Sequence, residues 1–339
     1  MLAFWLMFAA PLLAFMTTLA AAHWLARPDA RWRLLDHPNA RSLHQRPVPR
    51  TGGWAVLGGV FLGGAGLAAF LPDLRPHLTP LLYGLLPLVF ISWLDDRQGV
   101  AAHWRFIVHA GVATSLILAG LTLSPSQTLF LPETPLIWAL RGLTGLFIVW
   151  MINLYNFMDG MDGFAGGMAV IGFASLAWLG CADAGFAAVC IMISAACIGF
   201  LAHNFPPARL FLGDTGSTAL GFLAAACSLW GSQRGLFPFW AALWVFSPFI
   251  VDATVTLLRR LWRGERIWEA HRSHYYQRLV LLGWGHRRTV LAEYVLMLAC
   301  AGSAILAVHL PAQHAFLLAL GVGGVYGLLM AGVHRLERR

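Results

Sequence analysis

Long apolar stretches alternate with short polar segments along the whole chain. Eleven stretches are apolar enough to be interpreted as membrane-spanning helices, which need roughly 20 apolar residues each. Their approximate ranges are 2–26, 52–71, 80–94, 106–124, 136–153, 164–181, 185–202, 215–231, 237–257, 290–309 and 312–333. The third segment is short and needs flanking residues to cross a bilayer. Pro248 is expected to kink the ninth segment, because proline disrupts helical hydrogen bonding.

The composition agrees with this pattern. Hydrophobic residues make up 59% of the chain and charged residues only 11%, against about a quarter in soluble domains. Little is left for a soluble domain, so the sequence predicts an all-α, polytopic membrane protein with one domain over residues 1–339. The first segment lacks the basic start of a signal peptide and is longer than its usual apolar core, so we expect a retained helix.

The basic residues are distributed unevenly about the predicted spans. All 23 are arginine, and all but Arg75, Arg141 and Arg234 fall in polar segments on one side of the membrane. Because basic loops stay in the cytoplasm, this side is predicted to be cytoplasmic, with the N-terminus outside and the C-terminus inside. The net charge of +8 therefore reflects membrane orientation, and we do not expect nucleic-acid binding.

Three short polar islands on the predicted cytoplasmic side contain five of the fifteen acidic residues. They are Asp95-Asp96, the run 153–163 and the run 213–217. Carboxylates beside a membrane are costly unless they bind something. Their company of Asn, Gly, Ser and Thr favours a divalent cation together with a phosphate, since Mg²⁺ prefers oxygen ligands and is often shared with substrate phosphates.

In the first island, Asp95 and Asp96 are neighbours near the end of a predicted helix. Adjacent helical residues point about 100° apart, so the two carboxylates should have different partners. One could bind Mg²⁺ while the other contacts an acceptor phosphate. The alternative is a helix cap, or ion pairs with Arg97 and Arg105.

The second island repeats polar side chains every three residues, at Asn153, Asn156, Asp159 and Asp162. Such a row rotates around a helix, so the four cannot share one face. Glycines at positions 160 and 163 are expected to break the helix and let the backbone approach a ligand. These side chains suit ribose hydroxyls, a uracil edge or metal-bound water; the alternative is a polar turn between two spans.

The third island places Asp214 at the start of a predicted helix, where it could cap the helix, bind a metal, or do both. A fourth polar region contains His271, Arg272 and His274. If this region is helical, the two histidines share a face, and they suit a pyrophosphate better than zinc. Nearby arginines could contact phosphate or anionic lipid headgroups. Scattered histidines, His109 among them, are assigned no role.

These four regions, together with the early segments 36–42 and 49–53, resemble the polyprenyl-phosphate N-acetylhexosamine-1-phosphate transferases, the MraY/WecA superfamily. The resemblance runs through most of the chain. It implies that undecaprenyl phosphate attacks the sugar-linked phosphorus of a UDP-N-acetylhexosamine and that UMP leaves. It also implies dependence on Mg²⁺ or Mn²⁺, an active site facing the cytoplasm at the bacterial inner membrane, and a homodimer, since dimers are common in the family.

The resemblance also assigns candidate roles residue by residue. The candidate metal ligands are Asp214 and Asp95. The candidate catalytic residues are Asp95, Asp96, Asp159, Asp162, His271 and His274. The candidate substrate-binding residues are Asn153, Asn156, Gly163, Asn204, Phe211 and Arg272. A phosphate monoester is already largely ionised near pH 7, so direct attack is favoured over a covalent aspartyl intermediate, which stays an alternative.

The histidine region differs from the corresponding loop in the peptidoglycan branch of this superfamily, where the resemblance implies three histidines in a row. Here the run His271-Arg272-Ser273-His274 looks like the enzymes that initiate O-antigen or related surface glycans. UDP-GlcNAc, UDP-QuiNAc or UDP-FucNAc is therefore the expected donor, with a phospho-MurNAc-pentapeptide transferase as the alternative. An ion-coupled transporter would use acids such as Asp252. A CDP-alcohol phosphotransferase is a further alternative, but the pattern of aspartates followed by Ala-Arg that is typical of it is missing after Asp162.

Overall fold

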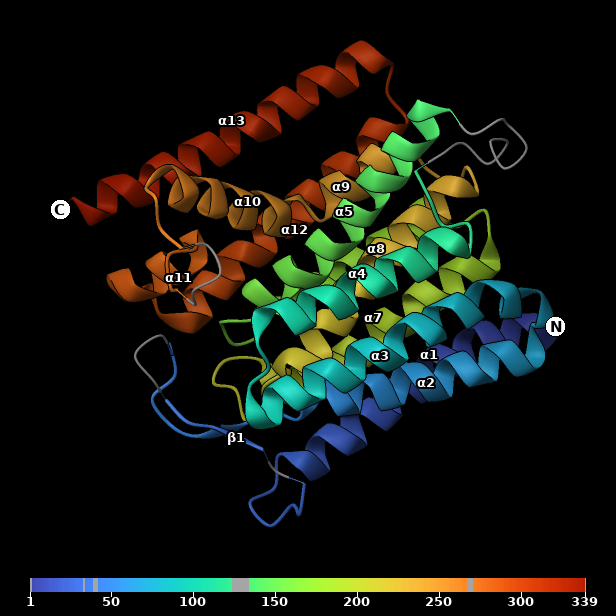
Figure 1. Cartoon of the computed structure of the whole chain (residues 1–339), viewed down its shortest axis with the longest axis horizontal. Helices are drawn as coiled ribbons and strands as arrows, with labels where there is room; N and C mark the ends of the chain where they lie inside the picture. The colour runs from blue at the N-terminus through green and yellow to red at the C-terminus, as the bar shows by residue number, and fades with distance from the viewer. Residues whose placement is uncertain (1, 33, 39–41, 124–133, 267–270, 339) are drawn as a thin grey trace.

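The computed structural model describes residues 2–32, 34–38, 42–123, 134–266 and 271–338, and helices dominate this part of the chain (Figure 1). The long and medium helices are α1 (Leu2–Leu25), α2 (Gly52–Phe70), α3 (Arg75–Gln98), α4 (Ala102–Leu118), α5 (Pro135–Phe157), α6 (Phe164–Leu179), α7 (Ala184–Asn204), α8 (Gly213–Gln233), α9 (Phe239–Val245), α10 (Ser247–Trp262), α12 (Gly285–Val308) and α13 (Ala312–Glu337). Short elements are η1 (Pro72–Leu74), α11 (Tyr275–Leu279), η3 (Val280–Trp284), and the strands β1 (Leu35–Asp36) and β2 (Val48–Pro49). The all-α prediction needs one small correction, because β1 and β2 pair antiparallel.

Each predicted apolar segment coincides with a helix, but fewer than eleven of these helices meet a criterion of length and hydropathy for a membrane span. Among the described residues, seven helices are long and apolar enough to cross a membrane, or eight if α9 and α10 form one bent span. The helices α4 and α6 are short, with 17 and 16 residues. The third segment does gain flanking residues, since α3 runs over 24 residues. The protein is a polytopic membrane protein.

The expected kink in the ninth segment is confirmed. The axes of α9 and α10 meet at 77°, and Pro248 lies in the first turn of α10. Proline is accepted there because the first helical N–H groups have no intrahelical partner. The bend matters for the site because it directs α10 toward α11 and the histidine region.

Helix α8 forms the centre of the bundle. It packs against α2, α3, α5, α6 and α9, and most of its residues are buried. Close approach is made possible by small residues: a Cβ on Gly53 of α2 would lie 2.4 Å from the backbone nitrogen of Gly216. A Cβ on Gly59 would lie 2.1 Å from the Thr18 hydroxyl, so α1 also packs closely on α2. The contact between Gly53 and Gly216 holds the first turn of α8, which carries the third polar island, against α2.

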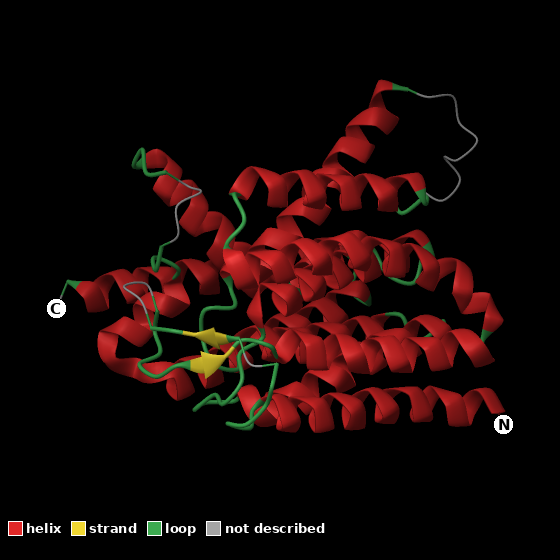
Figure 2. Cartoon of the chain, turned by 60° about the horizontal axis from the view of Figure 1, so that its bottom comes forward, coloured by secondary structure: helices red, strands yellow, loops and turns green. Residues whose placement is uncertain are grey.

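The polar loops gather at one end of the bundle. Figure 2 shows the β1–β2 ribbon and several loops at the end where the chain's C-terminus lies, while the N-terminus lies at the opposite end. The last turn of α3, the α5–α6 connection, the first turn of α8 and the start of α11 meet at this end and line one cavity. The fold therefore brings all four polar regions together.

Candidate active site

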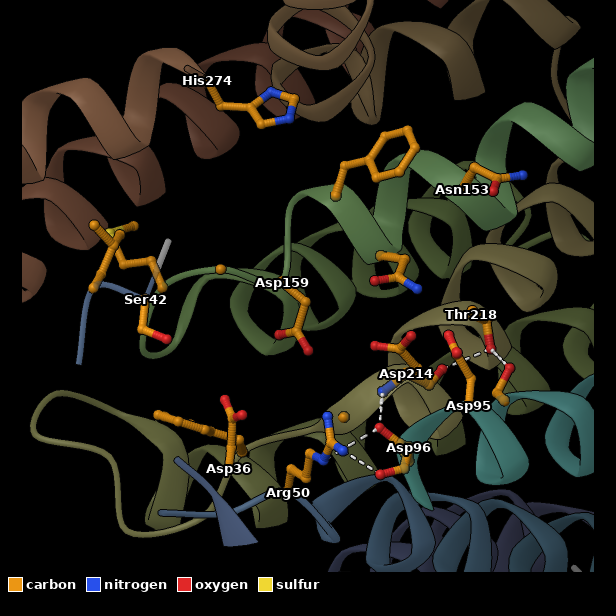
Figure 3. A pocket seen from close by; sticks show the side chains of 18 of the residues that line it. Asp36, Ser42, Arg50, Asp95, Asp96, Asn153, Asp159, Asp214, Thr218 and His274 are labelled. Carbon is orange, nitrogen blue, oxygen red and sulfur yellow. Dashed lines mark hydrogen bonds and ion pairs between the residues drawn. The ribbon is translucent and has the colours of Figure 1, made fainter. Parts of the chain in front are cut away.

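A cavity of about 520 Å³ lies among these loops. Figure 3 shows Asp95, Asp96 and Asp214 on one wall, His274 on the opposite wall, and Asp159 pointing into the space between them. The sequence-predicted residues that line the cavity are Asp95, Asp96, Asn153, Asn156, Asp159, Asp162, Asn204, Phe211, Asp214, His271 and His274. Gly163 and Arg272 are not among the lining residues.

Asp95 and Asp214 meet at a single guanidinium group. Arg105 Nη1 lies 2.5 Å from Asp95 Oδ2 and 3.7 Å from Asp214 Oδ2. The other oxygen of Asp95 accepts a hydrogen bond from the backbone N–H of Val100 at 2.6 Å. Asp214 accepts a further hydrogen bond from the side chain of Asn156. Two carboxylates and one carboxamide therefore converge on a position that a cation already approaches.

This donor set fits an octahedral, oxygen-loving cation rather than zinc. Among the residues that the structure describes, no three His, Cys, Asp or Glu side chains are grouped closely enough to enclose a metal ion. Mg²⁺ does not need such a cage, because it is usually bound through one or two carboxylates and keeps waters and substrate phosphates as its other ligands. Asp95 and Asp214, with Asn156 beside them, would hold it.

Asp96 points away from Asp95, as expected for adjacent helical residues. Its Oδ1 accepts the backbone N–H of Asp214 at 3.2 Å, and its Oδ2 accepts the backbone N–H of Thr215 at 3.1 Å. The Thr215 hydroxyl donates to Oδ2 as well, at 2.9 Å. Arg50 adds an ion pair, with Nε 3.8 Å from Asp96 Oδ1. Asp96 thus caps the N-terminus of α8 from α3, and Asp214 lies inside the first turn instead of capping it.

The α5–α6 connection breaks as predicted. Gly163 has φ of +75°, a conformation that glycine adopts without strain, and it precedes the first residue of α6. Its N–H donates to Asn204 Oδ1 at 2.9 Å, and Asn204 Nδ2 donates to the Leu210 carbonyl at 2.9 Å. Gly163 and Asn204 therefore join the α5–α6 connection to the loop after α7.

The two aspartates of this connection have different surroundings. Asp162 Oδ1 lies 3.0 Å from His286 Nδ1, and its Oδ2 accepts the N–H of Ala208 at 2.9 Å. Asp159 makes no hydrogen bond or ion pair through its carboxylate with the described residues. Burial raises the pKa of Asp159 well above 3.8, and the charges of Asp214 and the other nearby carboxylates raise it further. Asp159 is therefore the carboxylate left open to a ligand.

His271 and His274 do not share a helical face, because α11 begins only at Tyr275 and both histidines precede it. His271 lies in the segment before α11, and His274 is the residue that precedes its first turn. The two rings nevertheless lie close, with centroids 4.8 Å apart. Burial, together with nearby positive charge such as that of Arg260, lowers the pKa of His271 to about 4. His271 is therefore a neutral hydrogen-bonding group near pH 7.

The early segment reaches the same cavity. Asp36, Ser42 and Arg50 line it, and the Gly52 N–H donates to the Phe211 carbonyl at 2.8 Å. Residues 39–41 of the early motif lie outside the described residues. The antiparallel pairing of β1 with β2 brings the two ends of this segment together, so that Arg50 stands beside Asp96.

Comparisons with known proteins agree with this site. Residues 78–232 match the family model described as Glycosyl transferase family 4. A Bacillus subtilis (strain 168) protein named "Probable undecaprenyl-phosphate N-acetylglucosaminyl 1-phosphate transferase" is 32% identical over 276 residues, covering 80% of this chain and 76% of that protein. A Yersinia pestis undecaprenyl-phosphate alpha-N-acetylglucosaminyl 1-phosphate transferase is 30% identical, with 79% and 77% covered. The chain belongs to glycosyl transferase family 4.

Together with these relatives, the family match shows that the chain is an enzyme of the polyprenyl-phosphate N-acetylhexosamine-1-phosphate transferase superfamily. The comparisons do not separate its branches. A phospho-N-acetylmuramoyl-pentapeptide-transferase from Picosynechococcus sp. is 31% identical, with 76% of this chain and 73% of that protein covered. The surface-glycan branch expected from the histidine region therefore stays a prediction.

Three residues that line the cavity of this glycosyl transferase family 4 member have no role that the sequence predicts. His286, at the start of α12, pairs with Asp162. His109 contacts the side chain of Asn153 at 3.2 Å, and Gln277 of α11 lines the cavity. His109 and Gln277 stand within otherwise ordinary helical sequence, and no spacing marks them. His286 follows Gly283 and Gly285, a glycine pair shortly before the apolar segment 290–309, and this pair is the one local signal that could have drawn attention to it.

Proposed function

We propose that this protein transfers N-acetylhexosamine 1-phosphate from a UDP-sugar to undecaprenyl phosphate and releases UMP. One observation carries the proposal: Asp95 and Asp214 converge on one cationic group in a cavity whose far wall holds His271 and His274. Such a cavity offers charge neutralisation at one wall and hydrogen bonding at the other, which is what phosphoryl transfer needs. The names of the relatives from Bacillus subtilis and Yersinia pestis support the same reaction.

Asp95 and Asp214 would hold Mg²⁺, or Mn²⁺, with Asn156 oriented by its hydrogen bond to Asp214. The bound ion would neutralise phosphate charge and draw the two substrates together. Asp96 positions Asp214 by capping α8, so its role is structural support of the metal site. Asp162 joins the α5–α6 connection to α12 and to the loop after α7, which also makes it a positioning residue.

The remaining cavity residues would bind substrates. Asp159, the open carboxylate, suits a hydroxyl group of the donor, and Asn153 and the Asn204–Phe211 loop suit its uridine. His271 and His274 suit the pyrophosphate and sugar, together with the exposed Arg272 between them. An acceptor phosphate is already largely ionised near pH 7, so the reaction needs no strong general base, and direct attack is favoured.

We further propose eleven spans, with the N-terminus outside, the C-terminus in the cytoplasm and the cavity open to the cytoplasm. The arginine distribution supports this orientation, as do the opposite positions of the two termini in Figure 2. A cytoplasmic cavity gives a soluble nucleotide sugar direct access while the lipid acceptor arrives within the membrane.

UDP-GlcNAc is the first donor to test, followed by UDP-QuiNAc and UDP-FucNAc, for a pathway that makes O-antigen or a related surface glycan. UDP-MurNAc-pentapeptide is the second candidate, because of the Picosynechococcus relative. The experiment measures UMP release by purified protein in detergent with undecaprenyl phosphate and Mg²⁺, and EDTA as the control. Release with one donor, abolished by EDTA, supports the proposal and names the donor; no release with any donor from folded protein contradicts it.

A further inference from the structure

Asp252 lies beneath the histidine wall of the cavity but is not one of its lining residues. It is buried in α10, just after the bend between α9 and α10, and only 8% exposed. A buried carboxylate needs several partners to offset the cost of its charge. The ion-coupled transporter alternative would assign this acid to an ion pathway, so its actual partners decide what it does.

Four donors surround the Asp252 carboxylate. Its Oδ1 accepts the Tyr275 N–H at 3.0 Å and the Thr256 hydroxyl at 3.0 Å, and its Oδ2 accepts the Tyr276 N–H at 3.2 Å. The fourth partner is His274, whose Nδ1 lies 3.4 Å from Oδ1. Asp252 thus caps the start of α11 and contacts the ring of the histidine that precedes it.

The ring of His274 is also held on its faces. It lies nearly parallel to the rings of Phe157 and Tyr276, with centroid distances of 6.4 and 5.9 Å. At its other end, α11 is tied to α13 by an ion pair between Arg278 and Glu337. Few orientations of His274 remain, and the contact with Asp252 involves its ring nitrogen Nδ1.

We propose that Asp252 is a positioning residue that holds the proton of His274 on Nδ1, and thereby presents Nε2 to the phosphate groups of the substrate. A carboxylate can only accept, so the Nδ1 that faces it carries the proton. The same pairing of a buried carboxylate with imidazole Nδ1 fixes the tautomer in hydrolytic triads and stabilises the imidazolium form. Asp252 therefore acts on the reaction through His274, and this role rests on the proposed function.

The competing arrangement is a capping box. In that arrangement Nδ1 of His274 accepts the backbone N–H of Gln277, while the Gln277 side chain accepts the His274 N–H. The proton would then lie on Nε2, and an unprotonated Nδ1 would face a carboxylate oxygen. Two lone pairs would oppose each other there, so the arrangement with Nδ1 protonated is favoured.

The first test does not depend on transferase activity. Protein labelled with ¹⁵N-histidine is studied by NMR in detergent, and the His274 signals are assigned with His274→Gln. An Nδ1–H signal for His274 that is present in the wild type and in Thr256→Val, and altered in Asp252→Asn, supports the proposal. An Nε2–H tautomer in the wild type overturns it. Failure of the proposed function would leave this result unaffected, so the two failures can be told apart.

The second test is a double-mutant cycle on turnover. Asp252→Asn should lower turnover by about 10- to 100-fold, by analogy with the loss when the hydrogen-bond partner of a metal-bound histidine is removed. In the His274→Gln background the same change should act within about 2-fold, because its effect passes through His274. An equal loss in both backgrounds would show that Asp252 only stabilises the fold, and would overturn the proposal.

Asp252→Glu is the control for the case in which Asp252→Asn does not fold. It keeps the carboxylate while moving it by one methylene, so it should restore more turnover than Asp252→Asn despite its poorer shape. If Asp252→Glu is no more active than Asp252→Asn, the charge is not what positions His274, and the proposal fails.

Discussion

Both hydrogen-bond donors of Thr215, the backbone N–H and the hydroxyl, point at one oxygen of Asp96, at 3.1 and 2.9 Å. The other oxygen receives the N–H of Asp214. The first turn of α8 is therefore fixed by a carboxylate from α3, and Asp214 leaves its own carboxylate free to face Asp95. This relationship separates the roles of the two adjacent aspartates of α3.

Asp96→Ala should lower the stability of the fold. The substitution leaves the buried N–H groups of Asp214 and Thr215 without their acceptor, which costs about 1–3 kcal/mol for such a group. The expected result is a lower midpoint of thermal unfolding in detergent, together with lost turnover. Asp95→Asn is the comparison, because its amide oxygen can still accept the Val100 N–H, and it should lose turnover with a midpoint close to that of the wild type. An inactive Asp96→Ala protein of wild-type stability would mean that Asp96 takes part in the chemistry.

Asp214→Asn should abolish turnover while the protein stays folded. The substitution keeps the side-chain size but removes one of the two charges that would hold Mg²⁺. Losing several kcal/mol of metal-based stabilisation corresponds to about 1,000-fold or more in rate. Turnover is measured as UMP release over a Mg²⁺ titration, with size-exclusion chromatography as the folding control. Near-normal release by this variant would remove Asp214 from the metal site.

Arg105→Gln should increase the affinity of the site for Mg²⁺ and decrease turnover. Its guanidinium group now contacts both Asp95 and Asp214, so it competes with a metal ion for the same oxygens. The same positive charge is suited to the substrate phosphates once the ion is bound. Arg97→Gln is the control, because Arg97 lies over the Trp93 ring and does not line the cavity. Mg²⁺ binding measured by thermal shift should tighten only in Arg105→Gln; equal shifts in both variants would contradict this assignment.

The raised pKa of Asp159 predicts that kcat/KM depends on pH. Burial and the neighbouring carboxylates raise its pKa, so the group is protonated at pH values where an ordinary aspartate is ionised. Only the ionised form accepts a hydrogen bond on both oxygens, so kcat/KM should fall as the pH falls through the raised pKa. Asp159→Asn should lose this acid limb and be less active at every pH. A wild-type acid limb in Asp159→Asn would assign the titration to another group.

The raised pKa of Asp159 also predicts how the stability of the fold changes with pH. A carboxyl whose pKa is higher in the folded state than in the unfolded state disfavours folding once it ionises. The penalty is absent below the unfolded value near 3.8, grows as the pH rises and is complete above the folded value. Asp159→Asn should therefore raise the unfolding midpoint at pH 7 and leave it nearly unchanged at pH 4. An equal effect at both pH values would contradict the electrostatic origin.

Much of the site could be predicted from the sequence because its residues stand out against an apolar chain. The break at Gly163 and the divergence of Asp95 from Asp96 follow from local rules of helix geometry, and the arginine distribution predicts that the polar islands lie on one side of the membrane. The condition that His271 and His274 lie on a helix is not met, and the proximity of their rings arises at the start of α11, which is capped by Asp252 from another helix. Local spacing says which faces differ, but only packing says what each face meets.

The role of Asp96 shows the same limit. The sequence allowed a cap as one alternative, but the first N–H group that Asp96 caps, that of Asp214, lies 118 residues later. The pairing of His286 with Asp162 joins positions 124 residues apart, and nothing in the local sequence marks His286 as a partner. The count of eleven spans stays a prediction, because α4, α6 and the central α8 are apolar but shorter or more polar than a typical span.

The most direct test of the central claim follows the phosphorus atoms of the donor. UDP-GlcNAc labelled with ³²P in the β-phosphate is incubated with the purified protein, undecaprenyl phosphate and Mg²⁺, with Asp214→Asn as control. If the sugar is transferred with its phosphate, the label moves to the lipid fraction and unlabelled UMP is released in equal amount. Label that stays in the aqueous phase as UDP while the sugar reaches the lipid would contradict the account, because it would mean transfer of the sugar alone.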